Sequence, residues 1–109
     1  MPYSESLADR VRLAIRGRRG IVEKRMFGAI VFLHCGNMLV GVWHATLIVR
    51  LGPDQAAMFA NEANVRPFDV TGKPMKGWLM VEPDGLENDR QLATWVDRAW
   101  LFVETLPPK

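Results

Sequence analysis

Hydrophobic residues near the N-terminus recur at the spacing of one helix face. They stand at positions i, i+4, i+7 and i+8, namely at Leu7, Val11, Ala14 and Ile15. Charged residues occupy most of the other positions, which is the pattern of an amphipathic helix. Ser4 is a suitable N-cap, and Gly17 suits the left-handed residue that follows a helix. The pattern therefore predicts a helix over residues 4–17.

A second and longer stripe of the same kind lies near the C-terminus. At about 100° per residue, seven hydrophobic side chains fall on one face of a helix: Leu92, Trp95, Val96, Ala99, Phe102, Val103 and Leu106. Pro107 and Pro108 end this helix, because proline cannot continue the hydrogen-bond ladder. Between the two stripes, Pro53 followed by QAAMFANE predicts a short helix that ends within residues 61–64.

Five shorter apolar runs are typical of strands, since they are too short for good helices and rich in β-branched residues. They cover residues 21–26, 29–35, 38–43, 47–51 and 78–82. Gly36 and Asn37 separate the second and third runs and predict a two-residue hairpin turn. In that register Cys35 faces Met38, and His34 points to the opposite face of the strand.

Both faces of this hairpin are apolar, so we expect it at the centre of the sheet, or with one face covered by a helix and the other by a partner. Residues 65–77 contain Pro67 and Pro74 and predict an extended loop. The order α-β-β-β-β-α-β-α predicts a single α+β domain over residues 1–109. It is a two-layer fold, in which an antiparallel sheet of about five strands has helices packed on one face.

The composition is that of an ordinary globular protein. Of the 109 residues, 49% are hydrophobic and 24% are charged, which excludes a disordered chain and a disulfide scaffold. Cys35 is the only cysteine, as expected in a reducing compartment. No apolar stretch approaches the ~18 residues of a membrane span, and the N-terminus lacks a signal-peptide pattern. We expect a cytoplasmic protein that has no membrane partner.

Side chains suited to catalysis or metal binding are few and scattered. The only serines, Ser4 and Ser6, suit helix capping. In the predicted register no histidine reaches Cys35, so we expect a buried structural cysteine and not a thiol nucleophile. The two histidines and the cysteine lack the paired spacing of zinc ligands, and no nucleotide-binding motif is present. We therefore expect a protein that is not an enzyme and has no metal or cofactor.

The formal net charge of +2 is unevenly distributed. Residues 1–25 hold seven Lys and Arg against three Asp and Glu. Four cations of this segment are candidates for contacts with nucleic-acid phosphates: Arg16, Arg18, Arg19 and Lys24. The alternative is a solvated helix end and turn, which agrees better with the small net charge and the lack of interleaved aromatic residues.

Two large apolar residues of the C-terminal helix, Trp100 and Leu101, fall outside its core stripe. Together with the second apolar face of the central hairpin they predict a protein–protein interface, and we expect a homodimer. The alternative is a lone exposed leucine beside a tryptophan whose edge packs on the core.

Several segments resemble one known family. They are KRMFG at 24–28, GNM at 36–38, VRLGP at 49–53, RPFDVTGKPMKGW at 66–78 and TLPPK at 105–109. With these segments the chain resembles, from about residue 10 to its end, the N-terminal domain of the TfoX (Sxy) competence-regulator family. The resemblance implies a cytoplasmic bacterial α+β domain with no established catalytic role. In two-domain relatives it is associated with activation of competence genes alongside the cyclic-AMP receptor protein. Because the sequence stops at Lys109, we expect a stand-alone member.

The longest matching segment, residues 66–78, has the composition of a shaped loop. Gly72 permits a turn with positive φ, Pro67 and Pro74 stiffen its arms, and Gly77 allows close approach of a backbone or a ligand. The candidate binding residues lie in this segment and near it: Arg25, Met26, Phe27, Gly28, Arg50, Arg66, Asp69, Lys73, Lys76, Gly77 and Trp78.

Two interpretations of this loop stay open. In one the loop binds a protein partner, with a role in transcription regulation. In the other it braces the sheet through a pair between Asp69 and either Arg50 or Arg66. A different class of function would be a small-molecule site or an undescribed enzyme, with a pocket formed by residues 26–28 and 76–78. A weak nucleic-acid binder ranks after it.

Overall fold

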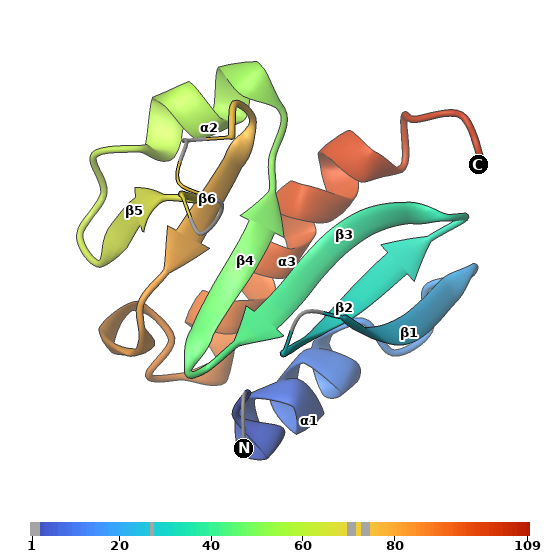
Figure 1. Cartoon of the computed structure of the whole chain (residues 1–109), viewed down its shortest axis with the longest axis horizontal. Helices are drawn as coiled ribbons and strands as arrows, with labels where there is room; N and C mark the ends of the chain where they lie inside the picture. Colours follow the sequence, from blue (N-terminus) through green and yellow to red (C-terminus); the bar gives the residue numbers. More distant parts are fainter. Residues whose placement is uncertain (1–2, 27, 70–71, 73–74) are drawn as a thin grey trace.

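Six strands pair into one antiparallel sheet, and helices pack against one of its faces (Figure 1). The structure, a computed structural model, describes residues 3–26, 28–69, 72 and 75–109. The elements follow one another as α1 (Glu5–Ala14), β1 (Ile21–Met26), β2 (Ala29–His34), β3 (Asn37–Trp43), β4 (Thr46–Arg50), α2 (Pro53–Phe59), β5 (Val65–Pro67), β6 (Trp78–Val81), the 3₁₀ helix η1 (Pro83–Gly85) and α3 (Asp89–Val103). The predicted two-layer α+β fold is confirmed.

The helix ends follow local capping chemistry. The Ser4 hydroxyl accepts a hydrogen bond from the Leu7 amide at 3.1 Å, as its position in the sequence predicted. At α3 the Asn88 side chain accepts from the Gln91 amide, and the Gln91 side chain accepts from the Asn88 amide. This reciprocal capping box sets the start of α3 and therefore the direction of its apolar face.

The core lies between the sheet and the helices α1 and α3. The predicted stripe of α3 is buried at Leu92, Trp95, Val96, Ala99 and Val103, while Phe102 and Leu106 pack at its margin. The strands contribute alternate residues to the same core: Ile30 and Phe32 from β2, Val40 and Val42 from β3, Leu47 and Val49 from β4, and Leu79 and Val81 from β6.

The sheet has one strand more than expected. Residues 65–67, predicted as part of a loop, form the short strand β5 and pair with β6 at the edge of the sheet. Pro67 is compatible with this position because an edge strand can lack one backbone donor. The strand order β1-β2-β3-β4-β6-β5 places the hairpin of β2 and β3 in the interior, as predicted.

The predicted register of this hairpin is wrong by one residue at the turn. Cys35 and Gly36 form the turn, both with positive φ (50° and 86°), and His34 pairs with Asn37. A bulge beside Leu39 then shifts the ladder, so that Phe32 faces Val40. Two contacts from the C-terminal segment accompany this register: the buried Asn37 amide donates to the Pro107 carbonyl at 2.9 Å, and the Lys109 amide donates to the Cys35 carbonyl at 2.8 Å.

The same shift corrects the predictions for Cys35 and His34. Because Cys35 is a turn residue, its thiol is exposed, not buried, and lies 3.7 Å from His34 Nε2. The two side chains therefore do not point to opposite faces. The other ring nitrogen of His34, Nδ1, lies 2.9 Å from the Arg19 carbonyl, and the ring packs at 4.5 Å against Trp100.

Candidate functional site

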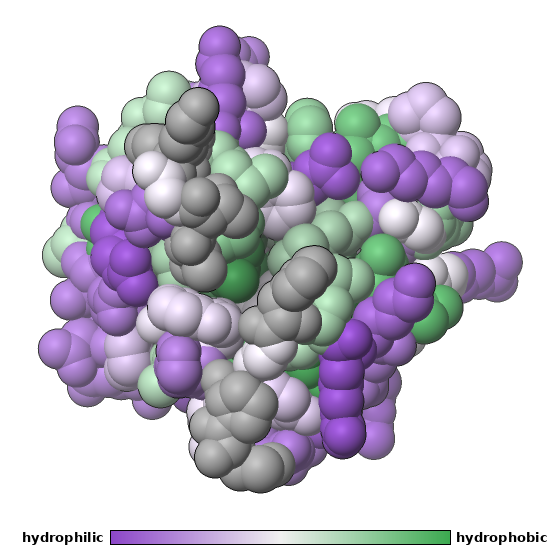
Figure 2. Space-filling model, in the orientation of Figure 1, coloured by the Kyte–Doolittle hydropathy of each residue, from purple (hydrophilic) through white to green (hydrophobic). Residues whose placement is uncertain are grey.

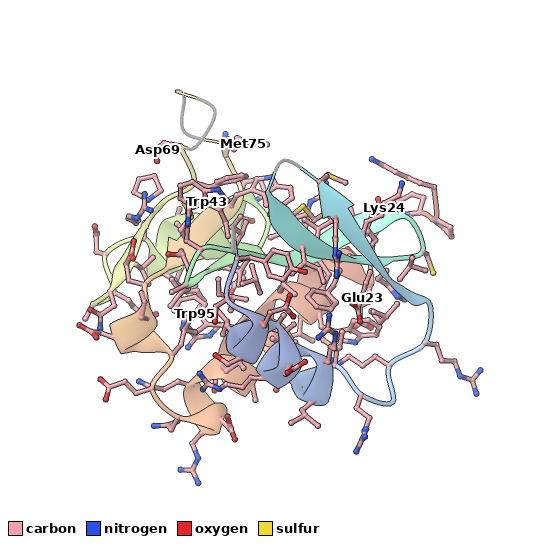
Figure 3. All side chains as sticks on the ribbon, turned by 60° about the horizontal axis from the view of Figure 1, so that its bottom comes forward. Glu23, Lys24, Trp43, Asp69, Met75 and Trp95 are labelled. Atoms are coloured by element: carbon pink, nitrogen blue, oxygen red, sulfur yellow. The ribbon has the colours of Figure 1, made fainter. Side chains whose placement is uncertain are left out.

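The sheet face turned away from α1 and α3 is the candidate functional site, and we call it the open face. In Figure 3, Lys24 and Trp43 lie on this side of the sheet, whereas Glu23 and Trp95 lie on the side of the helices. The strand register places one residue of each strand in a row across its middle: Lys24, Val31, Gly41, Ile48, Met80 and Arg66. The row is apolar at its centre and carries a cation at each end.

Apolar side chains on either side of this row are only partly covered. Val22 and Met26 of β1 are 60% and 36% exposed, and Met75, which follows β5, is 39% exposed. Figure 2 shows green, apolar surface over the middle strands, with purple, hydrophilic side chains around it. The half-buried apolar residues of the face are Leu33, Met38, Trp43, Phe68 and Trp78. Apolar side chains gathered on one exposed face are typical of an interaction surface.

The described residues 68, 69, 72 and 75–77 form an arm between β5 and β6, and backbone hydrogen bonds join several of them. The Met75 amide donates to the Phe68 carbonyl at 2.9 Å, and the Gly72 amide donates to the Asp69 carbonyl at 2.8 Å. Gly72 has the positive φ, 92°, that the sequence predicted. Figure 3 places Asp69 and Met75 above the strands, on the side of the open face.

Gly77, the last residue of the arm, is hydrogen-bonded to the loop between β4 and α2. Its carbonyl accepts hydrogen bonds from the amides of Leu51 and Gly52 at 2.9 and 3.0 Å. A Cβ at position 77 would lie 3.3 Å from the Gly52 carbonyl carbon, so the predicted close approach of a backbone is confirmed. The arm therefore rests on the loop that precedes α2.

Arg66 and Arg50 have different surroundings on this face. Arg66 pairs with Glu82, and its Nη1 lies 3.5 Å from Asp69 Oδ1. Arg50 packs its guanidinium over the ring of Trp78, 5.2 Å from the ring centre, and Trp78 in turn contacts Phe68 at 5.7 Å. Of the two predicted partners of Asp69, it is therefore Arg66 that contacts it.

The other predicted binding residues are only partly brought together. Met26 lies on the open face, and the exposed Gly28 follows it in the turn to β2. Arg25 alternates to the helix side, because it pairs in register with the core residue Ile30. Lys76 is exposed beside Gly77. Phe27 and Lys73 lie outside the described residues.

Sequence reasoning missed the residues that form most of the open face. A Cβ at Gly41 would lie 3.0 Å from Met38 Cε and 3.2 Å from Val31 Cγ1, so both side chains close over this glycine. Ile48 and Met80 continue the face on the next two strands. The signal for them was the apolar character of both hairpin faces, which predicted a second covered or partnered face without naming its residues.

The predicted interface residues of α3 differ from each other in exposure. Trp100 is half-buried, packed between His34 and the guanidinium of Arg18, which lies 5.0 Å from its ring. Leu101 is 68% exposed. Arg18 also pairs with Asp97, whereas Arg16 and Arg19 are exposed in the segment between α1 and β1.

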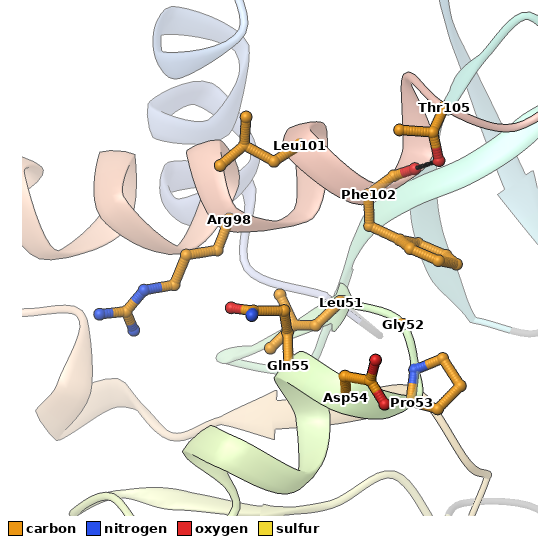
Figure 4. A pocket seen from close by; sticks show the side chains of 9 residues that line it. All are labelled: Leu51, Gly52, Pro53, Asp54, Gln55, Arg98, Leu101, Phe102 and Thr105. Atoms are coloured by element: carbon orange, nitrogen blue, oxygen red, sulfur yellow. Dashed lines mark hydrogen bonds between the residues drawn. The ribbon is translucent and has the colours of Figure 1, made fainter.

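Leu101 stands at the rim of a cavity of about 370 Å³ between α2 and α3 (Figure 4). Leu51 and Phe102 supply apolar walls, and Asp54 and Arg98 bring opposite charges. The Arg98 guanidinium packs over the Phe59 ring at 3.9 Å and lies 3.5 Å from Glu62. The cavity therefore combines apolar surface with a cation that already has a carboxylate beside it.

An ion pair joins α1 to β1 on the helix side. Arg12 donates two hydrogen bonds to the Glu23 carboxylate, both at 2.9 Å, and one to Asp9 at 2.6 Å. The hydrogen bonds from Arg12 hold the pKa of the Glu23 carboxyl below its usual value, and they raise the pKa of Arg12 further above its own.

The described residues offer neither a cluster of metal ligands nor a membrane-spanning helix. They contain no group of three or more His, Cys, Asp or Glu side chains placed to hold a metal ion. Within the same part of the chain, none of the helices has the length and apolar character needed to cross a membrane.

Comparison with known protein families gives a match over most of the chain. The family model described as TfoX N-terminal domain covers residues 13–103, which include α1 from its last turn, all six strands and α3. Neither a curated protein nor a solved structure matches the chain significantly.

Proposed function

This chain belongs to the TfoX N-terminal domain family, and we propose that it is a non-catalytic protein-interaction module of competence-related regulation. Its partner is a protein of the transcription machinery, and its compartment is the cytoplasm, where bacterial transcription takes place. The family supports the regulatory context, and the open face supports the mode of action.

The observation that carries this proposal is the partly exposed apolar face of the sheet. Val22, Met26 and Met75 are all exposed there, although burying such side chains is favourable by roughly 25 cal/mol per Å². A protein partner that covers this face would remove them from water. The charged groups at the margin, such as Lys24 and Arg66, would then set the orientation of the partner.

The test compares two variants that carry added carboxylates in different places. The double variant Met26→Glu/Met75→Glu puts carboxylates on the open face. The control variant Met58→Glu carries one on α2, where Met58 is 65% exposed and belongs to no strand. Both variants and the parent protein are used to capture proteins from a bacterial extract, and each captured protein is then purified and titrated by calorimetry.

We expect a partner that binds the parent protein and Met58→Glu alike and binds the double variant at least tenfold more weakly. The cyclic-AMP receptor protein is the first purified candidate to titrate. A partner with equal affinity for all three proteins would contradict the proposed face. Circular dichroism and thermal unfolding of each variant establish that the loss does not come from unfolding.

A second candidate function is favoured by the cavity between α2 and α3. Its volume of about 370 Å³ is in the range of small-molecule sites, and it combines apolar walls with polar groups. Native mass spectrometry of the protein purified from its host would detect a retained ligand. A bound mass that is lost in Phe102→Ala, while the fold is kept, would support this function over the first.

A further inference from the structure

We propose that the open face binds an acidic amphipathic helix of its protein partner. This inference rests on the proposed function and adds to it the structure and charge of the segment that is bound. Three independent features of the face support it: the state of its backbone groups, the charge of its margin and the side chains at its surface.

The backbone groups of the inner strands favour a helix over an extended segment. β2, β3, β4 and β6 each have a hydrogen-bonded strand on both sides, so most of their backbone donors and acceptors are used within the sheet. An extended peptide laid on this face would leave its own backbone unpaired, whereas a helix satisfies its backbone internally. The helices α1 and α3 already pack against the opposite face of the same sheet.

The dimensions are also suitable for a helix. Six strands at about 4.8 Å spacing extend over roughly 24 Å between the outer strand axes. A helix of about 16 residues has the same length at 1.5 Å per residue. One such helix can therefore reach from Lys24 on β1 to Arg66 on β5.

The charge of the margin favours an acidic helix. The face and its arm carry four described cations, Lys24, Arg50, Arg66 and Lys76, and two described carboxylates, Asp69 and Glu82. Both carboxylates lie against Arg66. Among the described residues, Lys24 and Lys76 take part in no ion pair, and they are exposed. Like-charged groups also make this face a poor partner for a second copy of itself.

The surface of the face is rich in methionine. Met26, Met38 and Met75 are exposed or half-buried there, and Met80 is a buried residue of the same face. Methionine is unbranched and polarizable, so a surface of this kind adapts to the apolar stripe of a helix without needing one unique sequence.

The test uses designed peptides as probes. One peptide of about 16 residues carries Leu at helical spacing and Glu at most other positions, and a second has Lys in place of every Glu. Binding to the whole protein is followed by tryptophan fluorescence, since Trp43 and Trp78 lie on this face, and by calorimetry. We expect the acidic peptide to bind at least tenfold more tightly than the basic one. Raising the salt from about 50 to 300 mM should weaken its binding several-fold.

Two double charge reversals locate the site. Lys24→Glu/Lys76→Glu changes the open face, and Arg16→Glu/Arg19→Glu makes the same change of net charge in the segment between α1 and β1. We expect the first double variant to bind the acidic peptide at least tenfold more weakly than the parent protein does. The second should bind it with an affinity within about twofold of the parent protein's. Equal weakening by both, equal binding of the two peptides, or no binding of either would overturn the inference.

Failure of the acidic-helix inference can be distinguished from failure of the proposed function. If a captured protein needs Met26 and Met75 but competes with neither peptide, the interaction module stands and the acidic helix is wrong. Competition between that protein and the acidic peptide alone would support both.

Discussion

Gly77 holds the arm of the open face in place through its backbone alone. Its carbonyl accepts two hydrogen bonds from the loop before α2, and its φ of 91° lies in the region that disfavours residues with a Cβ. A methyl group there would also press against the backbone of Gly52 at 3.3 Å. We expect Gly77→Ala to lower the free energy of unfolding by about 2 to 3 kcal/mol, measured by urea denaturation.

Gly72 provides the matched control for this prediction. Its φ of 92° is the same within a degree, but a Cβ there meets no described atom within 4 Å. Gly72→Ala should therefore lower the free energy of unfolding by only about 1 kcal/mol, the cost of a Cβ at positive φ. Equal losses in the two variants would contradict the role given to the contact between Gly77 and Gly52.

The exposed thiol of Cys35 gives a second prediction at the level of single residues. Because Cys35 is a turn residue, it should react with a thiol reagent such as DTNB in native buffer, one equivalent per chain. The reaction should be about as fast as in urea-unfolded protein. Cys35→Ser should give no reaction, and a thiol that reacts only after unfolding would contradict the observed register.

At the scale of elements, the ion pair between Arg12 and Glu23 ties α1 to the edge strand β1. Since the pKa of Glu23 is lower in the folded protein than its ordinary value of 4.5, the unfolded chain takes up the proton first as the pH falls. The pair therefore stabilises the fold above pH 4.5, and this contribution is lost as the pH falls through the lowered pKa. Both side chains are partly exposed, so the effect should stay below about 1 kcal/mol.

Urea denaturation between pH 3 and 7 measures this contribution. We expect Glu23→Gln to be slightly less stable than the parent protein at pH 7, and the difference to shrink as the pH falls below 4.5 toward 3. Asp54→Asn serves as a control, because no described ion pair includes Asp54. A constant difference between Glu23→Gln and the parent protein at every pH would contradict the assignment.

The elements differ in how far the sequence predicts them. Long periodic patterns, such as the stripe of α3, predict both the element and its buried face, because many residues contribute to one signal. The three residues of β5 carry no such pattern, and their proline suggests a loop until the pairing with β6 is known. The turn at Cys35 and Gly36 depends on the distant residues Pro107 and Lys109, which bond to Asn37 and Cys35.

The candidate site was predictable only where its residues are close together in the sequence. Residues close together in the sequence, such as Gly77 of the arm and Trp78 of β6, were identified from the local segment. The floor of the open face comes from four strands, and only the pairing of Ile48 with Gly41 and Met80 brings it together. Arg25 was placed in the site because of its neighbours in sequence, although the alternation of β1 turns it to the other side.

At the scale of the whole molecule, the helices leave a second surface that does not overlap the open face. Leu101 is 68% exposed on α3, at the rim of the cavity that faces α2. A two-fold dimer brings such a residue close to its own copy, because both protomers use the same patch. A homodimer formed there would leave both open faces free to bind helices of a partner.

Sedimentation velocity under reducing conditions tests this arrangement. We expect a dimer at concentrations near 10 µM for the parent protein, in the range of a modest apolar interface. Leu101→Glu should be monomeric, because it would bury an unpaired carboxylate. Val22→Glu adds the same charge at a similarly exposed position on the open face and should stay dimeric. A monomeric parent protein would exclude the dimer. If Val22→Glu alone dissociated the dimer, the dimer interface would lie on the open face, and no free surface would be left there for the acidic helix.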